Sequence, residues 1–186
     1  ANQGTATCSF TVTVTDNQAP VISGCPSTIN VGTDAGVCTA AVSWTEPTAS
    51  DYCDGAVVYF SRSHAPGSTF VKGTTTVTYV FKDAAGNSSS CTFDVNVSDD
   101  EAPVVATCPT NINVTTDAGL CTAVVSYAAP TFNDNCDGNG LSGTMTAGLA
   151  SGSAFPKGTT TVTYTYTDLA NQGTATCSFT VTVTDN

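Results

Sequence analysis

The chain carries CTFDVNV at residues 91–97 and CSFTVTV at residues 177–183. In both stretches every second residue is polar and the residues between are apolar or cysteine. This period of two is typical of a β-strand that turns one face to a core and the other to water. Because helical periodicity appears nowhere in the chain, we expect an all-β fold.

The same alternation marks residues 74–82 and 159–167, and a third inward-facing set falls on residues 38–45. Turn signals such as Asp34-Ala35-Gly36 separate these segments. Many short strands with regularly spaced turns predict a β-sandwich of the immunoglobulin-like kind. In the first half of the chain we expect strands near residues 28–33, 38–45, 56–63, 74–82 and 89–97, with weaker strands between them.

The chain also repeats itself. Residues 1–17 recur letter for letter as residues 170–186, and between the two copies one pattern of four cysteines occurs twice. Such self-similarity indicates an array of one structural unit. We therefore expect residues 18–99 and 100–186 to be two complete sandwiches, and residues 1–17 to be the last strand of a truncated upstream repeat. The chain then reads as a window cut from a longer fibre.

A series of short motifs recurs in the same order in both repeats. In the first repeat they are Cys25-Pro26, residues 34–38 (DAGVC), 47–53, 73–79 (GTTTVTY), 83–87 (DAAGN) and 91–97. Taken together, these motifs resemble the HYR (hyalin repeat) module, although the second repeat departs from it in the turn at residues 168–173. The resemblance implies immunoglobulin-like extracellular modules in tandem, used in adhesion and in long, often bacterial, surface proteins. It does not imply catalysis.

Eight of the nine cysteines fall into the two matching sets of four. In short β-rich modules this pattern indicates disulfides and an oxidising compartment, hence an extracellular or cell-surface location. A zinc site is disfavoured because the chain has no CxxC and a single histidine. Cys38 and Cys91 share the inward parity of their strands, and Cys25 and Cys53 should both lie near the end where the domain is entered. We therefore expect the pairs Cys25–Cys53, Cys38–Cys91, Cys108–Cys136 and Cys121–Cys177. Pairing of Cys25 with Cys91 stays open, and Cys8 should pair with an upstream repeat.

Acidic residues dominate the charge: 15 Asp and Glu stand against four Lys and Arg, for a net charge of -11. Nucleic acids and anionic membranes need a basic surface, so this balance argues against both as partners. The chain also lacks an apolar run of membrane-spanning length, so we expect no direct insertion into a membrane.

The carboxylates gather where the loops of a sandwich should converge, and hard oxygen ligands from loops are what Ca²⁺ requires. Calcium is therefore the cofactor that we consider, against the alternative that acidic turns merely cap loops and keep the surface soluble. The candidate ligands of the second repeat are Asp99, Asp100, Glu101, Asp134, Asp137 and Asp168. The equivalent set of the first repeat is Asp16, Asn17, Asp51, Asp54, Asp83 and Asn87.

Two functions fit these observations. The first is structural: an extended, disulfide-stapled stalk or filament of tandem domains, whose partners are further repeats of the same chain or copies of itself along a fibre. The second is an adhesion module that binds a glycan or protein ligand through its loops. We expect no enzyme, because no Ser/His/Asp or Cys/His arrangement recurs in both repeats.

Overall fold

The structure, a computed structural model, describes residues 3–170 and 172–185, and every regular element within them is a β-strand. The prediction of an all-β fold is therefore confirmed. The first repeat contributes β1 (Val21–Ser23), β2 (Ile29–Gly32), β3 (Thr39–Val42), β4 (Thr48–Asp51), β5 (Gly55–Val57), β6 (Tyr59–Arg62), β7 (Ser68–Val71), β8 (Gly73–Lys82) and β9 (Ser88–Ser98). The second contributes β10 (Val104–Thr107), β11 (Ile112–Thr115), β12 (Thr122–Val125), β13 (Thr131–Asp134), β14 (Gly138–Ser142), β15 (Thr144–Ala147), β16 (Ser153–Pro156), β17 (Gly158–Thr167) and β18 (Thr174–Thr184).

The chain packs into two compact units, which do not coincide with the two sequence repeats. Unit 1 consists of Ala1–Ile29, Ser43–Ser68 and Thr75–Val95. Unit 2 consists of Asn30–Val42, Thr69–Thr74 and Asn96–Asn186. Unit 2 therefore holds the second repeat together with β3, most of β2 and β7, the first residues of β8 and the end of β9 from the first repeat.

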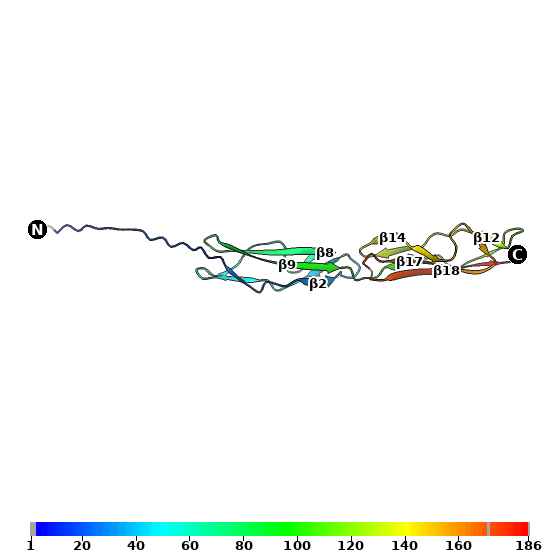
Figure 1. Cartoon of the computed structure of the whole chain (residues 1–186), viewed down its shortest axis with the longest axis horizontal. Coiled ribbons are helices and arrows are strands. Elements are labelled where there is room, and N and C mark those ends of the chain that lie inside the picture. Colours follow the sequence, from blue (N-terminus) through cyan, green and yellow to red (C-terminus); the bar gives the residue numbers. More distant parts are fainter. Residues whose placement is uncertain (1–2, 171, 186) are drawn as a thin grey trace. The chain divides into compact units, whose positions relative to one another are not determined.

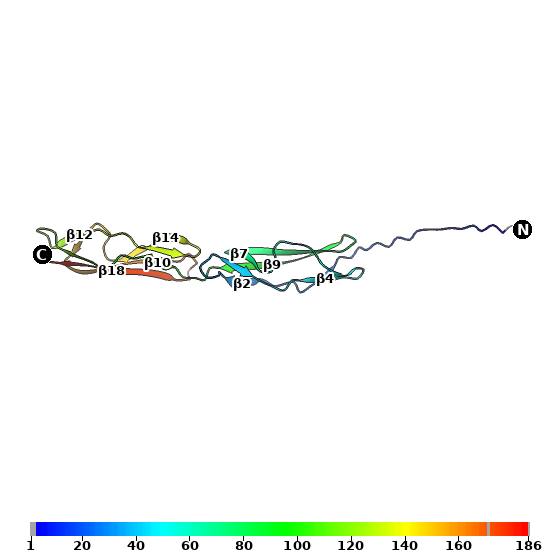
Figure 2. The ribbon, with the colours of Figure 1, turned by 180° about the vertical axis from the view of Figure 1, so that it is seen from behind.

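The second repeat is a sandwich of antiparallel hairpins with one parallel pair. One sheet has the strand order β11-β18-β17-β15, and the other strands form the sheets β10-β13-β14 and β12-β16. The long hairpin β17–β18 is paired from Gly158 opposite Val183 to Thr167 opposite Thr174, whereas β11 runs parallel to β18. In Figure 1, β14 and β18 run along opposite sides of this repeat. Figure 2 shows β12 at the end where the chain terminates.

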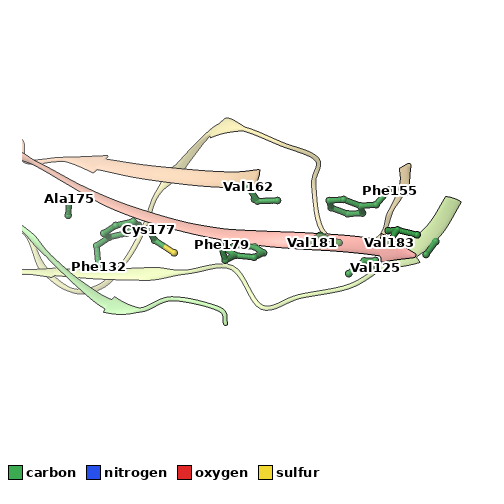
Figure 3. Close-up of a cluster of buried hydrophobic side chains, with 10 residues drawn as sticks. Val125, Phe132, Phe155, Val162, Ala175, Cys177, Phe179, Val181 and Val183 are labelled. Atoms are coloured by element: carbon green, nitrogen blue, oxygen red, sulfur yellow. The ribbon is translucent and has the colours of Figure 1, made fainter. Parts of the chain in front are cut away.

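The core of the second repeat is built on β18. Its side chains from Ala175 to Val183 are buried at every second position, as the alternation of CSFTVTV predicts. Phe132, Phe155 and Val162 reach them from other strands and are completely inaccessible to solvent (Figure 3). Full burial of one such side chain is worth about 1.5–3 kcal/mol, so this cluster supplies much of the stability of unit 2.

The first repeat has the same strand order, with the sheets β2-β9-β8-β6, β1-β4-β5 and β3-β7. Its aromatic core uses a hydrogen bond as well as packing. The indole Nε1 of Trp44 donates to the hydroxyl of Tyr79 at 2.9 Å, and the Trp44 ring meets Phe93 edge-on at 5.3 Å between centroids. Both halves of the chain are therefore immunoglobulin-like β-sandwiches, as predicted.

Strand boundaries follow the prediction closely except in two places. The strand expected at 56–63 is two strands, because the chain crosses between sheets at Val58: β5 pairs with β4, and β6 pairs with β8. The strand expected at 38–45 is shortened to β3. Residues 3–20 form no strand and expose Phe10 and other apolar side chains, so the assignment of residues 1–17 to an upstream repeat stays a prediction.

Candidate metal centre

Four aspartates converge in unit 2. Asp99 follows the end of β9, Asp134 is the last residue of β13, Asp137 lies in the turn before β14, and Asp168 follows the last residue of β17. One carboxylate oxygen from each lies within 4.8 Å of those of the other three. Asp99 and Asp168 are 2% exposed and Asp134 is 8% exposed. Four acidic groups are thus held together at one end of the β17–β18 hairpin, largely out of water.

Backbone amides fix the orientation of these side chains. Asp134 Oδ1 accepts hydrogen bonds from the amides of Cys136 and Asp137, both at 2.8 Å. Asp168 Oδ1 accepts from the amide of Ala170 at 2.7 Å and its Oδ2 from that of Gln172 at 3.0 Å. The loops are therefore already shaped around the carboxylates.

Two oxygens of this cluster have no partner. Asp99 Oδ1 and Asp134 Oδ2 are buried and accept no hydrogen bond from any described residue. A buried polar atom without a partner costs free energy, and a charged one costs more. Oxygens of this kind, pointing into a group of carboxylates, match what a hard cation binds.

One cation of the chain itself reaches the cluster. Lys72 Nζ lies 3.1 Å from Asp99 Oδ2, and this hydrogen bond raises the pKa of Lys72 despite the opposing effect of desolvation. The second repeat has the same arrangement at its other end, where Lys157 Nζ lies 2.6 Å from Asp185 Oδ2. Four carboxylates against one ammonium leave an excess of three formal negative charges.

Asp137 is the best hydrogen-bonded member of the four. Its Oδ2 accepts from the amide of Leu169 at 3.0 Å and from the hydroxyl of Tyr166 at 2.8 Å. The Leu169 amide is the main reason why the pKa of Asp137 is below its ordinary value; the Tyr166 hydroxyl and the charge of Lys72 act in the same direction. Burial, followed by the bond to Asp137, raises the pKa of Tyr166 to about 12, so the phenol stays a donor at neutral pH.

Asp100 and Glu101 do not belong to this cluster, although the sequence analysis placed them among the candidate ligands. The Thr33 hydroxyl donates to Asp100 Oδ1 at 3.3 Å, and the Gly36 amide donates to Glu101 Oε1 at 2.8 Å. Both carboxylates therefore hold the loop at residues 33–38. We call the contact between this loop and residues 99–101 and 134–137 the joint.

The joint is also closed covalently. Cys38 of the loop is bonded to Cys136, which lies between two of the cluster aspartates. Beside this bond, Asn135 Nδ2 donates to Val37 O and Thr33 Oγ1, both at 3.2 Å. A disulfide and several hydrogen bonds thus tie the loop of the first repeat to the carboxylate loops of the second.

The equivalent residues of the first repeat are assembled less completely. Oxygens of Asp16 and Asp51 lie with Cys53 Sγ within 4.8 Å of one another, and these carboxylates, Asp16 first, raise the pKa of the Cys53 thiol. Asp16 Oδ2 is a further buried oxygen without a partner among the described residues. The other predicted ligands lie around this group: Asp54 accepts from the Ala84 amide, Asp83 accepts from Asn87, and Asn17 is exposed.

The predicted disulfide pairing is wrong for all four pairs. The structure has Cys25–Cys91, which was the alternative left open, Cys108–Cys177 and Cys38–Cys136. Cys25–Cys53, Cys38–Cys91, Cys108–Cys136 and Cys121–Cys177 do not form, and Cys8, Cys53 and Cys121 are free thiols. Cys91 and Cys177 do face the core as parity predicts. Cys38, which is half-buried, and Cys121, which is exposed, lie before the strands that should carry them.

Sequence reasoning missed three residues of the site: Lys72, Tyr166 and Asn135. A signal was available for the first, because Lys72 and Asp99 recur at the same repeat positions as Lys157 and Asp185. For Tyr166, the alternation in residues 159–167 indicates an inward-facing side chain but gives no sign of its hydrogen bond to Asp137. Asn135 is replaced by Tyr52 in the first repeat, so no recurrence marks it.

Tandem immunoglobulin-like sandwiches held by disulfides define an extracellular repeat protein of the adhesion type. Residues 15–97 and 98–183 each match the HYR domain. The chain belongs to the HYR domain family, and its location is extracellular or at the cell surface. Within the described residues there is no helix that is long and apolar enough to cross a membrane.

Curated relatives include two proteins named hyalin. The chain is 38% identical to the one from Strongylocentrotus purpuratus over 183 residues, 95% of this chain and 15% of the relative. It is 39% identical to the one from Lytechinus variegatus over 182 residues, 96% of this chain and 33% of the relative. The chain thus spans a third or less of these relatives. Among solved structures, mouse clustered PcdhgC3 EC1-3 aligns with a TM-score of 0.38 and 15% identity, over 91% of this chain and 69% of the other.

Proposed function

We propose that this chain is a segment of an extended extracellular stalk or filament of tandem HYR repeats whose joints are stiffened by calcium. The role is structural and not catalytic. Its partners are neighbouring repeats of the same kind, either in one chain or along a fibre.

The observation that carries the proposal is the pair of buried, unpartnered oxygens on Asp99 and Asp134. Asp99 belongs to the segment that leaves β9, whereas the other three aspartates belong to loops of the second repeat. An ion bound by all four would fix the entering segment against those loops. One oxygen from each of the four aspartates supplies four of the six to eight ligands of Ca²⁺, and water molecules would supply the others.

The excess of negative charge supports a divalent cation. At 4.8 Å and an effective dielectric constant of about 20, two like unit charges repel by about 3.5 kcal/mol. Lys72 relieves part of this repulsion by pairing with Asp99. A divalent ion would relieve more, and Lys72, whose side chain is 38% exposed, is free to swing into solvent when the ion binds.

Thermal unfolding with and without calcium tests this proposal. An ion present at 100 times its dissociation constant adds about 2.7 kcal/mol to the stability of the state that binds it. We expect unit 2 to melt higher in CaCl₂ than in EDTA, and MgCl₂ to have a smaller effect because Mg²⁺ demands a tighter octahedral site. Asp168→Asn should abolish the shift. Asp94→Asn, which removes the same charge from a sheet face, should retain it, and equal melting in CaCl₂ and EDTA would disprove the calcium site.

A second candidate function, ligand binding through loops, is favoured by one feature of unit 1. A hollow of 360 Å³ is lined mainly by apolar side chains, including Pro47, Val58 and Tyr59, and Val58 is 84% exposed. Aromatic and aliphatic groups of this kind fit the apolar face of a sugar or a peptide side chain. Screening against a glycan array distinguishes the candidates: binding that Tyr59→Ala removes would favour adhesion, and no binding would favour the stalk.

A further inference from the structure

Two of the free thiols occupy the repeat positions of the bonded pair at the joint. Cys121 stands in the second repeat where Cys38 stands in the first, and Cys53 stands in the first where Cys136 stands in the second. Cys38 and Cys136 are joined by a disulfide, while Cys53 and Cys121 are both exposed and unbonded. Each of these thiols is therefore one half of a bond that the chain forms elsewhere.

The loop before Cys121 has the conformation of the loop before Cys38. Gly36 and Gly119 have the same φ of 73°, in the left-handed region. The backbone hydrogen bonds also correspond. The Val37 amide donates to Asp34 O at 3.1 Å, and the Leu120 amide donates to Asp117 O at 3.0 Å. The Lys72 amide donates to Cys38 O at 3.3 Å, and the Lys157 amide donates to Cys121 O at 3.0 Å. Cys121 is thus presented by the same scaffold that presents Cys38 to its partner.

Cys53 likewise sits on the same turn as Cys136. The Cys53 amide donates to Asp51 Oδ1 at 2.7 Å, and the Cys136 amide donates to Asp134 Oδ1 at 2.8 Å. In each case the cysteine follows a hairpin strand by two residues, after β4 in one repeat and β13 in the other. The Cys53 turn therefore needs no rearrangement to form a disulfide of the kind that Cys136 forms with Cys38.

The surface around Cys121 is hollowed in a way that fits such a partner. A depression of 320 Å³ is lined by residues 116–121 and Asp185. At the complete joint, the Cys38 loop is met by Asn135 and Glu101. Their counterparts in the first repeat are Tyr52, which is 92% exposed, and Gln18, whose amide oxygen can accept from the Gly119 amide as Glu101 accepts from Gly36. Leu120, 58% exposed, offers Tyr52 an apolar contact.

We propose that Cys121 forms a disulfide with Cys53 of another copy of this repeat pair, so that the Cys38–Cys136 bond recurs at the following joint. This proposal rests on the stalk function, and it names the covalent link by which one pair of repeats is joined to the next. Residues 1–17 are identical to residues 170–186, so the same strand precedes the Cys53 repeat and ends the Cys121 repeat, as a continuous array requires.

Bond formation needs an oxidant, for which glutathione disulfide is a suitable reagent. The Cys53 thiolate attacks one sulfur of glutathione disulfide and releases the first glutathione thiolate. The Cys121 thiolate then attacks the Cys53 sulfur of the mixed disulfide and releases the second. Two protein thiols are oxidised, one glutathione disulfide is reduced to two glutathione thiols, and the two protons pass to the released thiolates.

The test uses the intact chain in a Cys8→Ser background, incubated with oxidised and reduced glutathione and analysed by non-reducing electrophoresis and peptide mass mapping. We expect a ladder of oligomers with Cys53–Cys121 peptides. Cys53→Ser alone and Cys121→Ser alone should stay monomeric, whereas their mixture should stop at dimers. A fused chain, in which residues 170–186 of one copy serve as residues 1–17 of the next, measures the same bond within one molecule.

The outcomes separate the alternatives. A Cys53–Cys121 bond in the fused chain only would assign it to successive repeats of one polypeptide, and its presence in both experiments would extend it to separate molecules. The proposal is overturned by the absence of this peptide in both experiments, by Cys53–Cys53 or Cys121–Cys121 dimers in the single variants, or by a bond between the two cysteines of one copy. A calcium-dependent melting shift that persists in such a case would leave the calcium-stiffened stalk standing.

Discussion

The Cys108–Cys177 disulfide should contribute as much to the stability of unit 2 as a large buried side chain of its core. The bond closes a loop with a sequence separation of 69 residues. In the chain-entropy treatment, releasing a loop of this length restores about 4.4 kcal/mol of conformational freedom to the unfolded chain. With a urea slope of about 2 kcal/mol per molar, Cys108→Ala/Cys177→Ala should lower the midpoint of unit 2 by about 2 M.

The assay must report on each unit separately, and the chain offers a means. Trp44 is the only tryptophan and lies in unit 1, so its fluorescence follows unit 1, while hydrogen exchange of β17 and β18 peptides follows unit 2. The matched control is Cys25→Ala/Cys91→Ala, with a sequence separation of 66, which should shift the Trp44 transition instead. A loss below about 1 kcal/mol in unit 2, or an equal shift of the Trp44 transition by both variants, would refute this reasoning.

Three further outcomes are expected. The amide of Leu169, above all, holds the pKa of Asp137 below its ordinary 3.8. The stability that this carboxylate provides is therefore complete above pH 3.8 and is lost as the pH falls through the lower pKa of the folded state. Asp137→Asn should make the urea midpoint of unit 2 less dependent on pH between about pH 4 and 2. Phe155→Ala should cost unit 2 about 3–5 kcal/mol in urea because the ring is fully buried, whereas Leu169→Ala, at an 81% exposed position, should stay within about 0.5 kcal/mol. Lys72→Met should tighten calcium binding, measured by calorimetry, since it removes the cation that competes for Asp99; unchanged or weaker affinity would contradict this account.

The alternation of residues 91–97 and 177–183 was sufficient to predict the strands and the core, because side chains in a strand must point alternately to its two faces. The break at Val58 was not predictable in this way. The residues on both sides of it have the composition of one strand, and only the pairing of β5 and β6 with different sheets ends the first and begins the second.

Strand parity, the alternation of side chains between the two faces of a strand, was not sufficient to predict the disulfides. Parity states which face of a strand a cysteine occupies, but Cys38 and Cys121 precede β3 and β12, so the rule does not apply to them. Pairing within one repeat was also assumed. Cys38 bonds to a cysteine of the next repeat, and the recurrence of cysteines in both repeats is equally compatible with either arrangement.

The acidic site was predicted in part. The turns that carry Asp134, Asp137 and Asp168 meet because an immunoglobulin-like sandwich brings alternate loops to one end. Asp100 and Glu101 adjoin Asp99 in the sequence, and the sequence alone does not separate their roles from that of Asp99. Asp100 and Glu101 instead accept hydrogen bonds from Thr33 and Gly36 of the loop at residues 33–38, and Asp99 alone of the three reaches the cluster.

The Cys108–Cys177 bond also decides how unit 2 responds to pulling. Cys108 lies just after β10 near the start of the second repeat, and Cys177 lies within its last strand. A tensile force that enters before Cys108 and leaves after Cys177 passes through the sulfur atoms and bypasses the residues between them. At about 3.4 Å per residue, a loop of 69 residues has an extended length of about 230 Å, and tension cannot extend it while the bond is intact. Under tension the second repeat can thus lengthen very little while the bond is intact. In a reducing environment the residues between Cys108 and Cys177 would bear the force and could be extended.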